Sequence, residues 1–134
     1  MRAVVLFSAV VLAASPAAAA NAATVGCAQV MQNTTGLAGI IAGAASSYWA
    51  HREKFVELTY GELRLTVPNA QQLAAKEKSQ ADPLKAAMLN ALASFKALVA
   101  TARSQNCLPQ AKLAAIAEPT IRLATRINFD QFPL

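Results

Sequence analysis

The amino-acid sequence predicts a small all-α protein, an irregular antiparallel helical bundle that follows an N-terminal signal peptide. Three observations lead to this fold class. Alanine is very frequent after the first 20 residues, and alanine is the best helix former and a poor strand residue. Apolar residues recur at spacings of three and four over several long stretches. The segments between these stretches are short, which favours antiparallel neighbours.

The composition excludes several other classes of protein. The chain has 134 residues, which is enough for one domain and not for two. Hydrophobic residues make up 55% and charged residues 14%, so intrinsic disorder is excluded. Five glycines and two cysteines are too few for a collagen-like or disulfide-dense chain.

Residues 1–20 have the three parts of a secretory signal peptide. Arg2 supplies the positive charge, residues 3–14 form the apolar stretch, and Ala18-Ala19-Ala20 is a small-x-small cleavage site. The apolar stretch is too short to span a bilayer, which takes about 20 residues. We therefore expect residues 1–20 to be removed, and residues 21–134 to form a single helical domain that is periplasmic or secreted.

Cys27 and Cys107 are the only cysteines. In an oxidising compartment two cysteines pair, so we predict one disulfide between them. A second interpretation stays open, because Ala23-Thr24-Val25-Gly26-Cys27 loosely resembles the lipobox of bacterial lipoproteins. Acylation of Cys27 would turn a soluble protein into a membrane-anchored one.

The first part of the domain contains an apolar run. Residues 21–33 are a weakly patterned lead-in that can form a short helix. Residues 34–45 are small and apolar and include a Gly39-xxx-Gly43 pair. This pair is typical of closely packed helices, in membranes above all. The apolar run is only about ten residues long, so we predict a buried core helix rather than a membrane span.

Residues 48–67 carry two competing periodicities. One set of apolar residues recurs as on one face of a helix: Trp49, Val56, Tyr60, Leu63 and Val67. Residues 62–67 also alternate between polar and apolar, which is typical of a strand. Helix and strand thus remain alternatives for 57–67, and we favour helix because its period covers the longer stretch. Pro68 should end this element, and Asn69 can cap the next one.

Asp82-Pro83 predicts the start of the next long helix, after a short polar helix or turn over residues 70–81. An aspartate caps a helix through its side-chain oxygen, and proline suits the first turn because no N–H is required there. We expect this helix to continue to about Ser104. Its apolar stripe contains Leu84, Met88, Ala91, Leu92, Phe95, Leu98, Val99 and Ala102.

A last helix should follow Leu108-Pro109. Its apolar face is formed by Leu113, Ile116, Thr120, Leu123 and Ile127. Glu118-Pro119 should interrupt or kink it. The tail, residues 128–134, carries Phe129 and Phe132, and we expect an extended segment that docks on the bundle.

The sequence nominates no catalytic centre, metal site or cofactor. His51 is the only histidine, and no set of ligands has the spacing of a metal site. Neither a nucleophile motif nor a phosphate-binding glycine loop occurs. The aromatic group formed by Trp49, His51 and Phe55 is a candidate ligand pocket, although such side chains often serve in the core of a small domain.

The positive charge is concentrated in one segment. The chain has a formal net charge of +5, and residues 69–112 contain six basic and two acidic residues. Lys85, Lys96 and Arg103 lie on one line of the predicted helix, at separations of eleven and seven residues. They either cover the edge of the apolar stripe with their stems or meet an acidic partner or anionic lipid head groups. The excess is too small, in an exported protein, to predict nucleic acid binding.

These observations predict an exported helical protein without enzymatic activity, an interaction or adaptor module for an unidentified protein. One alternative is an envelope-surface protein held by lipid at Cys27 or by the basic segment. Another is a small-ligand-binding protein that uses the aromatic group near Trp49. In each case we expect no transmembrane span in residues 21–134.

Overall fold

A computed structural model describes the backbone of residues 16–133 and the side chains of residues 26–133. The predicted cleavage region falls at the edge of this range, and most of the predicted signal peptide lies outside it. The described residues form helices and no strand, which confirms the all-α prediction. The helices are α1 (Pro16–Tyr60), α2 (Leu63–Thr66), α3 (Ala70–Ser104) and α4 (Gln110–Phe129).

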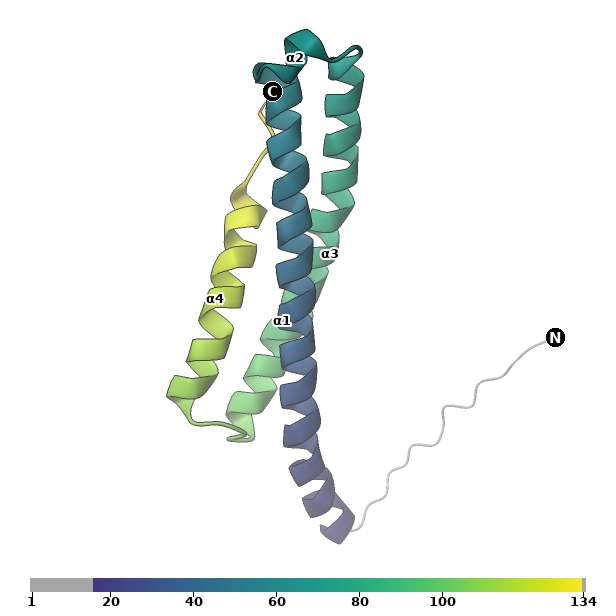
Figure 1. The fold of residues 1–134 in the computed structure, drawn as a ribbon. Coiled ribbons are helices and arrows are strands. Elements are labelled where there is room, and N and C mark those ends of the chain that lie inside the picture. The colour runs from purple at the N-terminus through teal and green to yellow at the C-terminus, as the bar shows by residue number, and fades with distance from the viewer. Residues whose placement is uncertain (1–15, 134) are drawn as a thin grey trace, which may run out of the picture.

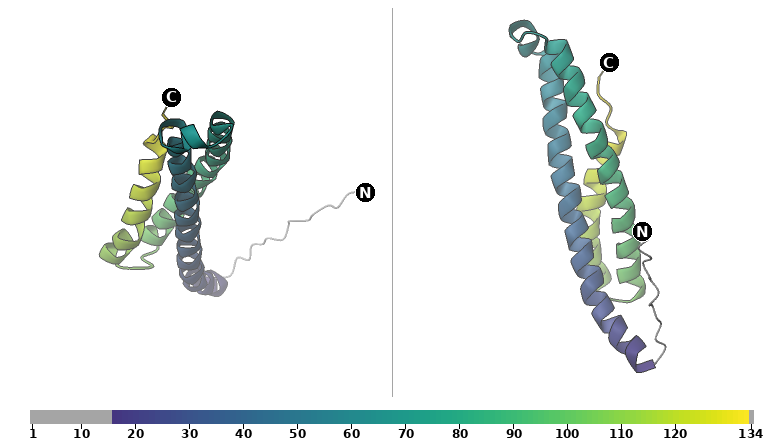
Figure 2. Two further views of the ribbon diagram at one scale, coloured as in Figure 1. Left: turned by 45° about the horizontal axis from the view of Figure 1, so that its top comes forward. Right: turned by 90° about the vertical axis from the view of Figure 1, so that its right-hand side faces the viewer.

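The molecule is built on a long antiparallel hairpin. Helices α1 and α3 lie side by side along most of their lengths, and α2 closes one end of the pair (Figure 1). Helix α4 is shorter and packs against α3 and α1 over the opposite half only (Figures 1 and 2). One half of the rod therefore has three helices, and the half that ends in α2 has two.

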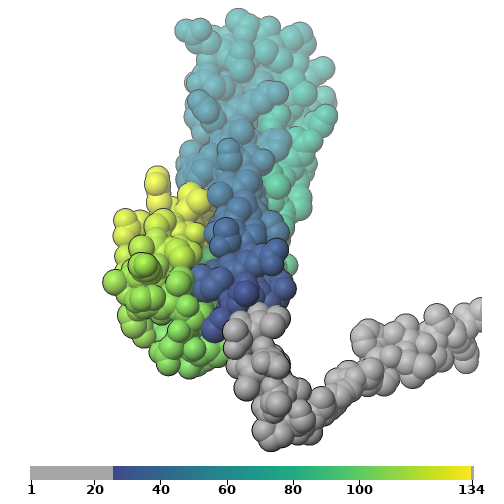
Figure 3. Space-filling model, turned by 60° about the horizontal axis from the view of Figure 1, so that its bottom comes forward, coloured from purple at the N-terminus to yellow at the C-terminus, as the bar shows by residue number. Residues whose placement is uncertain are grey.

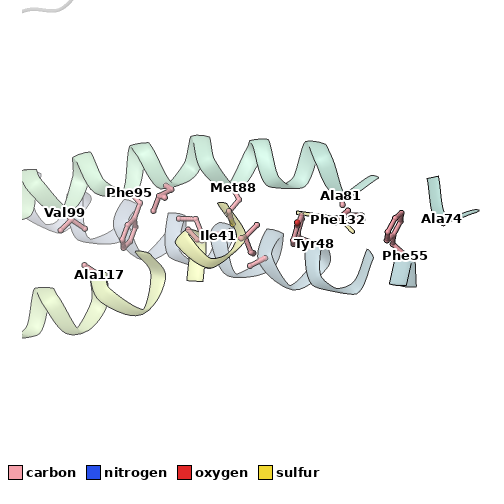
Figure 4. Close-up of a cluster of buried hydrophobic side chains, with 14 of the residues drawn as sticks. Ile41, Tyr48, Phe55, Ala74, Ala81, Met88, Phe95, Val99, Ala117 and Phe132 are labelled. Atoms are coloured by element: carbon pink, nitrogen blue, oxygen red, sulfur yellow. The ribbon is translucent and has the colours of Figure 1, made fainter. Parts of the chain in front are cut away.

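A seven-residue repeat holds the hairpin together. On α1 the buried residues at this spacing are Thr34, Ile41, Tyr48 and Phe55, and on α3 they are Ala74, Ala81, Met88, Phe95 and Ala102. A repeat of seven keeps the same face of each helix toward its partner, as in a coiled coil. Figure 4 shows Met88 opposite Ile41 and Ala81 beside Tyr48, so in the second pair a small residue on α3 accommodates a large one on α1.

The prediction of a helix start at Asp82-Pro83 is wrong, because α3 is continuous from Ala70 to Ser104 with Pro83 inside it. The buried stripe continues in register from Ala74 to Ala102 on both sides of the proline, and packing against α1 therefore keeps both parts in one helix. Pro83 itself is exposed, so water can reach the carbonyl group that its missing N–H leaves without a partner.

Residues 48–60 belong to α1, and the helical alternative is confirmed over this stretch, but the predicted face is wrong. Tyr60 is 52% exposed, while Tyr48, Phe55 and Leu58 are buried instead. Tyr48 and Phe55 belong to the seven-residue repeat, and Leu58 lies one turn further, so the buried face is displaced by one residue from the predicted Trp49 and Val56, which are half-buried. The strand alternative is wrong, because residues 63–66 form the single helical turn of α2.

The turns at the closed end depend on two special residues. An added Cβ on Gly61 would lie 2.9 Å from the backbone oxygen of Glu57, so no larger residue fits without a shift. Asn69 occupies the N-cap of α3, as predicted, but its φ of 59° is left-handed and its side chain makes no capping hydrogen bond. Asparagine is suited to this position because it tolerates the left-handed region.

Helix α4 and the tail largely follow the sequence prediction. Leu113 and Ile127 of the predicted face are buried, together with Ala117 and Ala124, whereas Ile116, Thr120 and Leu123 are half-buried. Helix α4 continues through Pro119 rather than being interrupted there. The tail leaves α4 in an extended conformation and buries Phe132. Phe129, which the sequence predicted as part of the extended tail, is instead the last residue of α4 and is 79% exposed, so only Phe132 docks on the bundle.

A disulfide joins Cys27 of α1 to Cys107 in the turn between α3 and α4, with an S–S distance of 2.08 Å and a Cα–Cα distance of 5.3 Å. The predicted pairing is confirmed, and the bond uses the sulfur atom that acylation of Cys27 would require. Figure 3 views the molecule from this end and shows α4 and the preceding turn against the first described side chains of α1. The crosslink thus closes the end of the hairpin opposite to α2.

Candidate functional site

The residues of the predicted aromatic pocket do not line one cavity. Phe55 is buried, and its ring centroid lies 4.8 Å from that of Phe132 in the tail. His51 is directed to α3, where its Nδ1 lies 2.5 Å from a carboxylate oxygen of Glu77. Trp49 lines a shallow depression of about 270 Å³ that neither His51 nor Phe55 lines.

Trp49 is half-buried on the side of α1 that faces α4. Its ring packs edge-to-face on Tyr48, with the centroids 5.5 Å apart. The guanidinium carbons of Arg52 and Arg126 lie 5.6 and 6.0 Å from the indole centroid. These are cation–π distances, so the tryptophan links α1 to α4.

Glu77 is the one buried charged residue in the described part of the chain, at 8% exposure. It accepts a hydrogen bond from His51, and the ammonium group of Lys54 lies 3.4 Å from its second oxygen. Burial acts to raise the pKa of Glu77, but the hydrogen bond to His51 and the charge of Lys54 outweigh it and lower the pKa. The cluster is a polar link between α1 and α3.

A second polar cluster holds the tail, with Asp130 at its centre. Arg52 Nε lies 2.9 and 2.7 Å from the two carboxylate oxygens, and the Tyr48 hydroxyl donates to Oδ2 at 2.6 Å. The ammonium group of Lys85 donates to the backbone oxygen of Asp130 at 2.7 Å. Burial first, and then the hydrogen bond to Asp130, raises the pKa of Tyr48 far above its ordinary value, so the phenol stays protonated.

The predicted basic line is divided by this arrangement. Lys85 is half-buried and holds the tail, whereas Lys96 and Arg103 are exposed on α3. All three lie on the same continuous helix, so their alignment follows from α3 itself. Only the last two are placed to meet an external surface.

The closed end of the hairpin, residues 60–73, carries a surface that the sequence did not predict, and we call it the hairpin tip. Large apolar side chains are exposed here: Tyr60, Leu63, Leu65 and Leu73. Leu65 is the most exposed of them, at 83%. A hollow of about 650 Å³ lies beside them, lined by Leu58, Thr59, Tyr60, Arg64, Val67, Asn69, Ala70 and Gln71. A clue in the sequence is the presence of three leucines around Gly61, Pro68 and Asn69, residues typical of turns.

Neither a metal centre nor a clear membrane span emerges from the described residues. Within residues 16–133 no group of three or more His, Cys, Asp or Glu side chains is placed to bind a metal ion. One helix, α3, is long and apolar enough to cross a membrane by length and composition. The core helix of a soluble protein meets the same criteria, so this property alone is weak evidence for a span.

Comparisons of the chain with protein-family models, with curated proteins and with solved structures find no match.

Proposed function

We propose that this protein is an exported interaction module without enzymatic activity, and that it contacts a partner protein through the hairpin tip. One observation carries the proposal. Of the six large apolar side chains exposed in the described part of the chain, four lie at the tip. Clustered exposed apolar side chains are typical of interaction sites, whereas single ones are ordinary.

The shape of the molecule supports this assignment. The tip ends the two-helix half of the rod, away from α4 and from the disulfide, so a partner can approach it from several sides (Figures 1 and 2). Exposed charged residues lie close to the leucines along the chain: Glu57, Glu62 and Arg64. An apolar centre with a polar rim is the usual composition of a protein interface, and the hollow beside it can receive an apolar side chain of the partner.

Two features support export. Residues 1–20 have the pattern of a signal peptide, and Cys27 and Cys107 are joined in a disulfide. Disulfides persist in oxidising compartments and are rare in the cytosol. We therefore place the protein in the periplasm or outside the cell.

Site-specific photo-crosslinking in the native host tests the proposal. A photoreactive residue at Leu65 should give a covalent adduct with a partner protein, since this side chain would lie in the interface. The same residue at Phe129, which is equally exposed on α4, is the matched control and should give none. Equal adducts at both positions, or no adduct at Leu65, would contradict the proposal.

A binding assay distinguishes the tip from the basic segment. Changing Leu63 and Leu65 to serine should abolish partner binding and leave the fold intact, because neither side chain is buried. The envelope-surface alternative predicts instead that Lys96→Gln and Arg103→Gln abolish binding to anionic vesicles in low salt, with no effect of the tip changes. That second outcome would replace the proposed function by the alternative.

A further inference from the structure

We propose that the α1–α3 hairpin carries a recognition slot for an extended peptide segment with an acidic residue two positions before an aromatic residue. The slot consists of Tyr48, Arg52 and Phe55 of α1 and Lys85 of α3, and we call it the tail slot. The protein's own tail fills it in the structure. A partner protein that presents the same acidic–aromatic pattern would bind there in place of the tail.

The first half of the slot recognises a carboxylate. Arg52 Nε lies within 2.9 Å of both oxygens of Asp130, and the Tyr48 hydroxyl donates to one of them. Burial and the neighbouring carboxylate keep the Tyr48 phenol protonated and therefore a donor. Lys85 binds the backbone oxygen of the same residue, which it would find in any extended segment. Charge-assisted bonds of this kind favour an acidic residue over a neutral one.

The second half of the slot recognises an aromatic ring. Phe132 is 9% exposed, and its ring centroid lies 4.8 Å from that of Phe55 and 5.8 Å from that of Tyr48. Both separations are typical of attractive aromatic pairs. Gln131, between the two anchors, is exposed. In an extended segment alternate residues point to the same side, so the required pattern is an acidic residue, any residue and an aromatic residue.

The slot is formed by the hairpin alone, and the tail that fills it belongs to another part of the chain. Its four residues lie on α1 and α3, and two of them, Tyr48 and Phe55, belong to the buried seven-residue repeat, whereas Asp130 and Phe132 come from the segment after α4. A hollow of about 290 Å³ remains beside the tail, lined in part by Lys78, Asp82 and Lys85. The slot therefore has room for a larger segment than the one that occupies it.

A partner can bind only after the tail has left the slot. The covalent connection of the tail to α4 makes this displacement harder. The tail follows α4 directly, so it competes at a high effective concentration, about millimolar for a short flexible connection. The affinity of an external segment is reduced to the fraction of molecules in which the slot is open. Weakening the tail without changing the slot should raise this fraction and the apparent affinity.

The experiment uses the full-length protein and a fluorescent synthetic peptide with the sequence of residues 128–134. The double variant Asp130→Asn/Phe132→Ala releases the tail and leaves the slot unchanged. It should bind the peptide at least about tenfold more tightly than the unaltered protein, because the slot is open in a larger fraction of molecules. The matched control Phe129→Ala changes an exposed residue beside the tail anchors and should bind as weakly as the unaltered protein.

Two further arms test specificity. Adding Arg52→Gln to the double variant should abolish the gain in affinity. A peptide in which Asp130 is replaced by Asn and Phe132 by Ala should bind to none of the proteins.

Circular dichroism shows whether each variant keeps its helices. If the double variant does not fold, Asp130→Asn alone provides the comparison, with a smaller gain of about threefold because Phe132 still holds the tail. Equal affinity of the tail-weakened and unaltered proteins, or binding that survives Arg52→Gln, would overturn the proposal.

Discussion

The carboxylate of Glu77 lies 2.5 Å from Nδ1 of His51, within the first turns of the stripe through which α3 packs against α1. Its neighbours on that stripe, Ala74 and Ala81, are both buried. A carboxylate at such a position loses its hydration, and only the bonds to His51 and Lys54 offset this cost. A slip of one helix along the other would break both bonds, so the cluster fixes the register of the hairpin.

Glu77→Gln should lower the free energy of unfolding at neutral pH. It should also make this free energy vary less with pH in the acidic range. Because the pKa of Glu77 is lowered in the folded state, its ionised form contributes stability above the ordinary value of 4.5, and this contribution is lost as the pH falls through the folded pKa. We expect a loss of about 1–3 kcal/mol at neutral pH. Urea denaturation between about pH 3 and pH 6 should show a smaller acid destabilisation in the variant. Glu53→Gln, at an exposed site on α1, is the control, and equal acid slopes in all three proteins would refute the assignment.

Reduction of the disulfide should destabilise the protein by about 4.5 kcal/mol on the chain-entropy model, because the bond joins residues 80 apart. Chemical denaturation with and without a reducing agent measures the difference. The double variant Cys27→Ser/Cys107→Ser should have the stability of the reduced protein in both conditions. An oxidised protein whose intact mass contains two free thiols would contradict the pairing.

Gly39 and Gly61 should respond oppositely to substitution by alanine. An added Cβ on Gly39 meets nothing within 4 Å, so Gly39→Ala removes only the conformational freedom of the unfolded chain and should stabilise by about 0.5–1 kcal/mol. Gly61→Ala forces the Cβ against the Glu57 carbonyl oxygen and should destabilise by about 1–3 kcal/mol. Thermal unfolding of the two variants provides the comparison, and changes of the same sign would refute the account of the α1 terminus.

Pro83→Ala should stabilise the protein, because it restores a backbone N–H inside α3 and removes the clash of the proline ring with the preceding turn. The gain is up to about 3 kcal/mol, the difference between the two residues inside a helix. Pro68→Ala is the matched control, since Pro68 lies in the turn before α3, where the change should give no gain. If Pro83 instead began a separate helix, its replacement would be neutral or harmful.

Local patterns predicted the helical class, the disulfide and most of the buried stripe over residues 84–102. They failed where packing between distant segments decides the outcome. Asp82-Pro83 has every local property of a helix start, but α1 supplies enough contact on both sides of it to maintain one helix. The seven-residue spacing of Thr34, Ile41, Tyr48 and Phe55 was present in the sequence, and recognition of it would have predicted both the long helix α1 and its buried face.

The candidate sites were harder to predict for a related reason. Trp49, His51 and Phe55 are close in sequence, but successive residues of a helix point in different directions, and each of these side chains meets a different element. The tail slot joins residues that are 82 positions apart, Tyr48 and Asp130, and no local spacing records such a contact. The hairpin tip depends on which leucines remain unpacked, which only the assembled fold decides.

The division of the rod into a three-helix half and a two-helix half gives it unequal resistance to opening. Near the disulfide, α3 buries Met88, Leu92, Phe95 and Val99, whereas toward the tip it buries Ala70, Ala74 and Ala81. Alanine removes far less apolar area from water than these larger side chains, so α3 contributes less free energy to the end near α2 than to the crosslinked end. We therefore expect local opening to begin at the tip, while the crosslinked base stays closed.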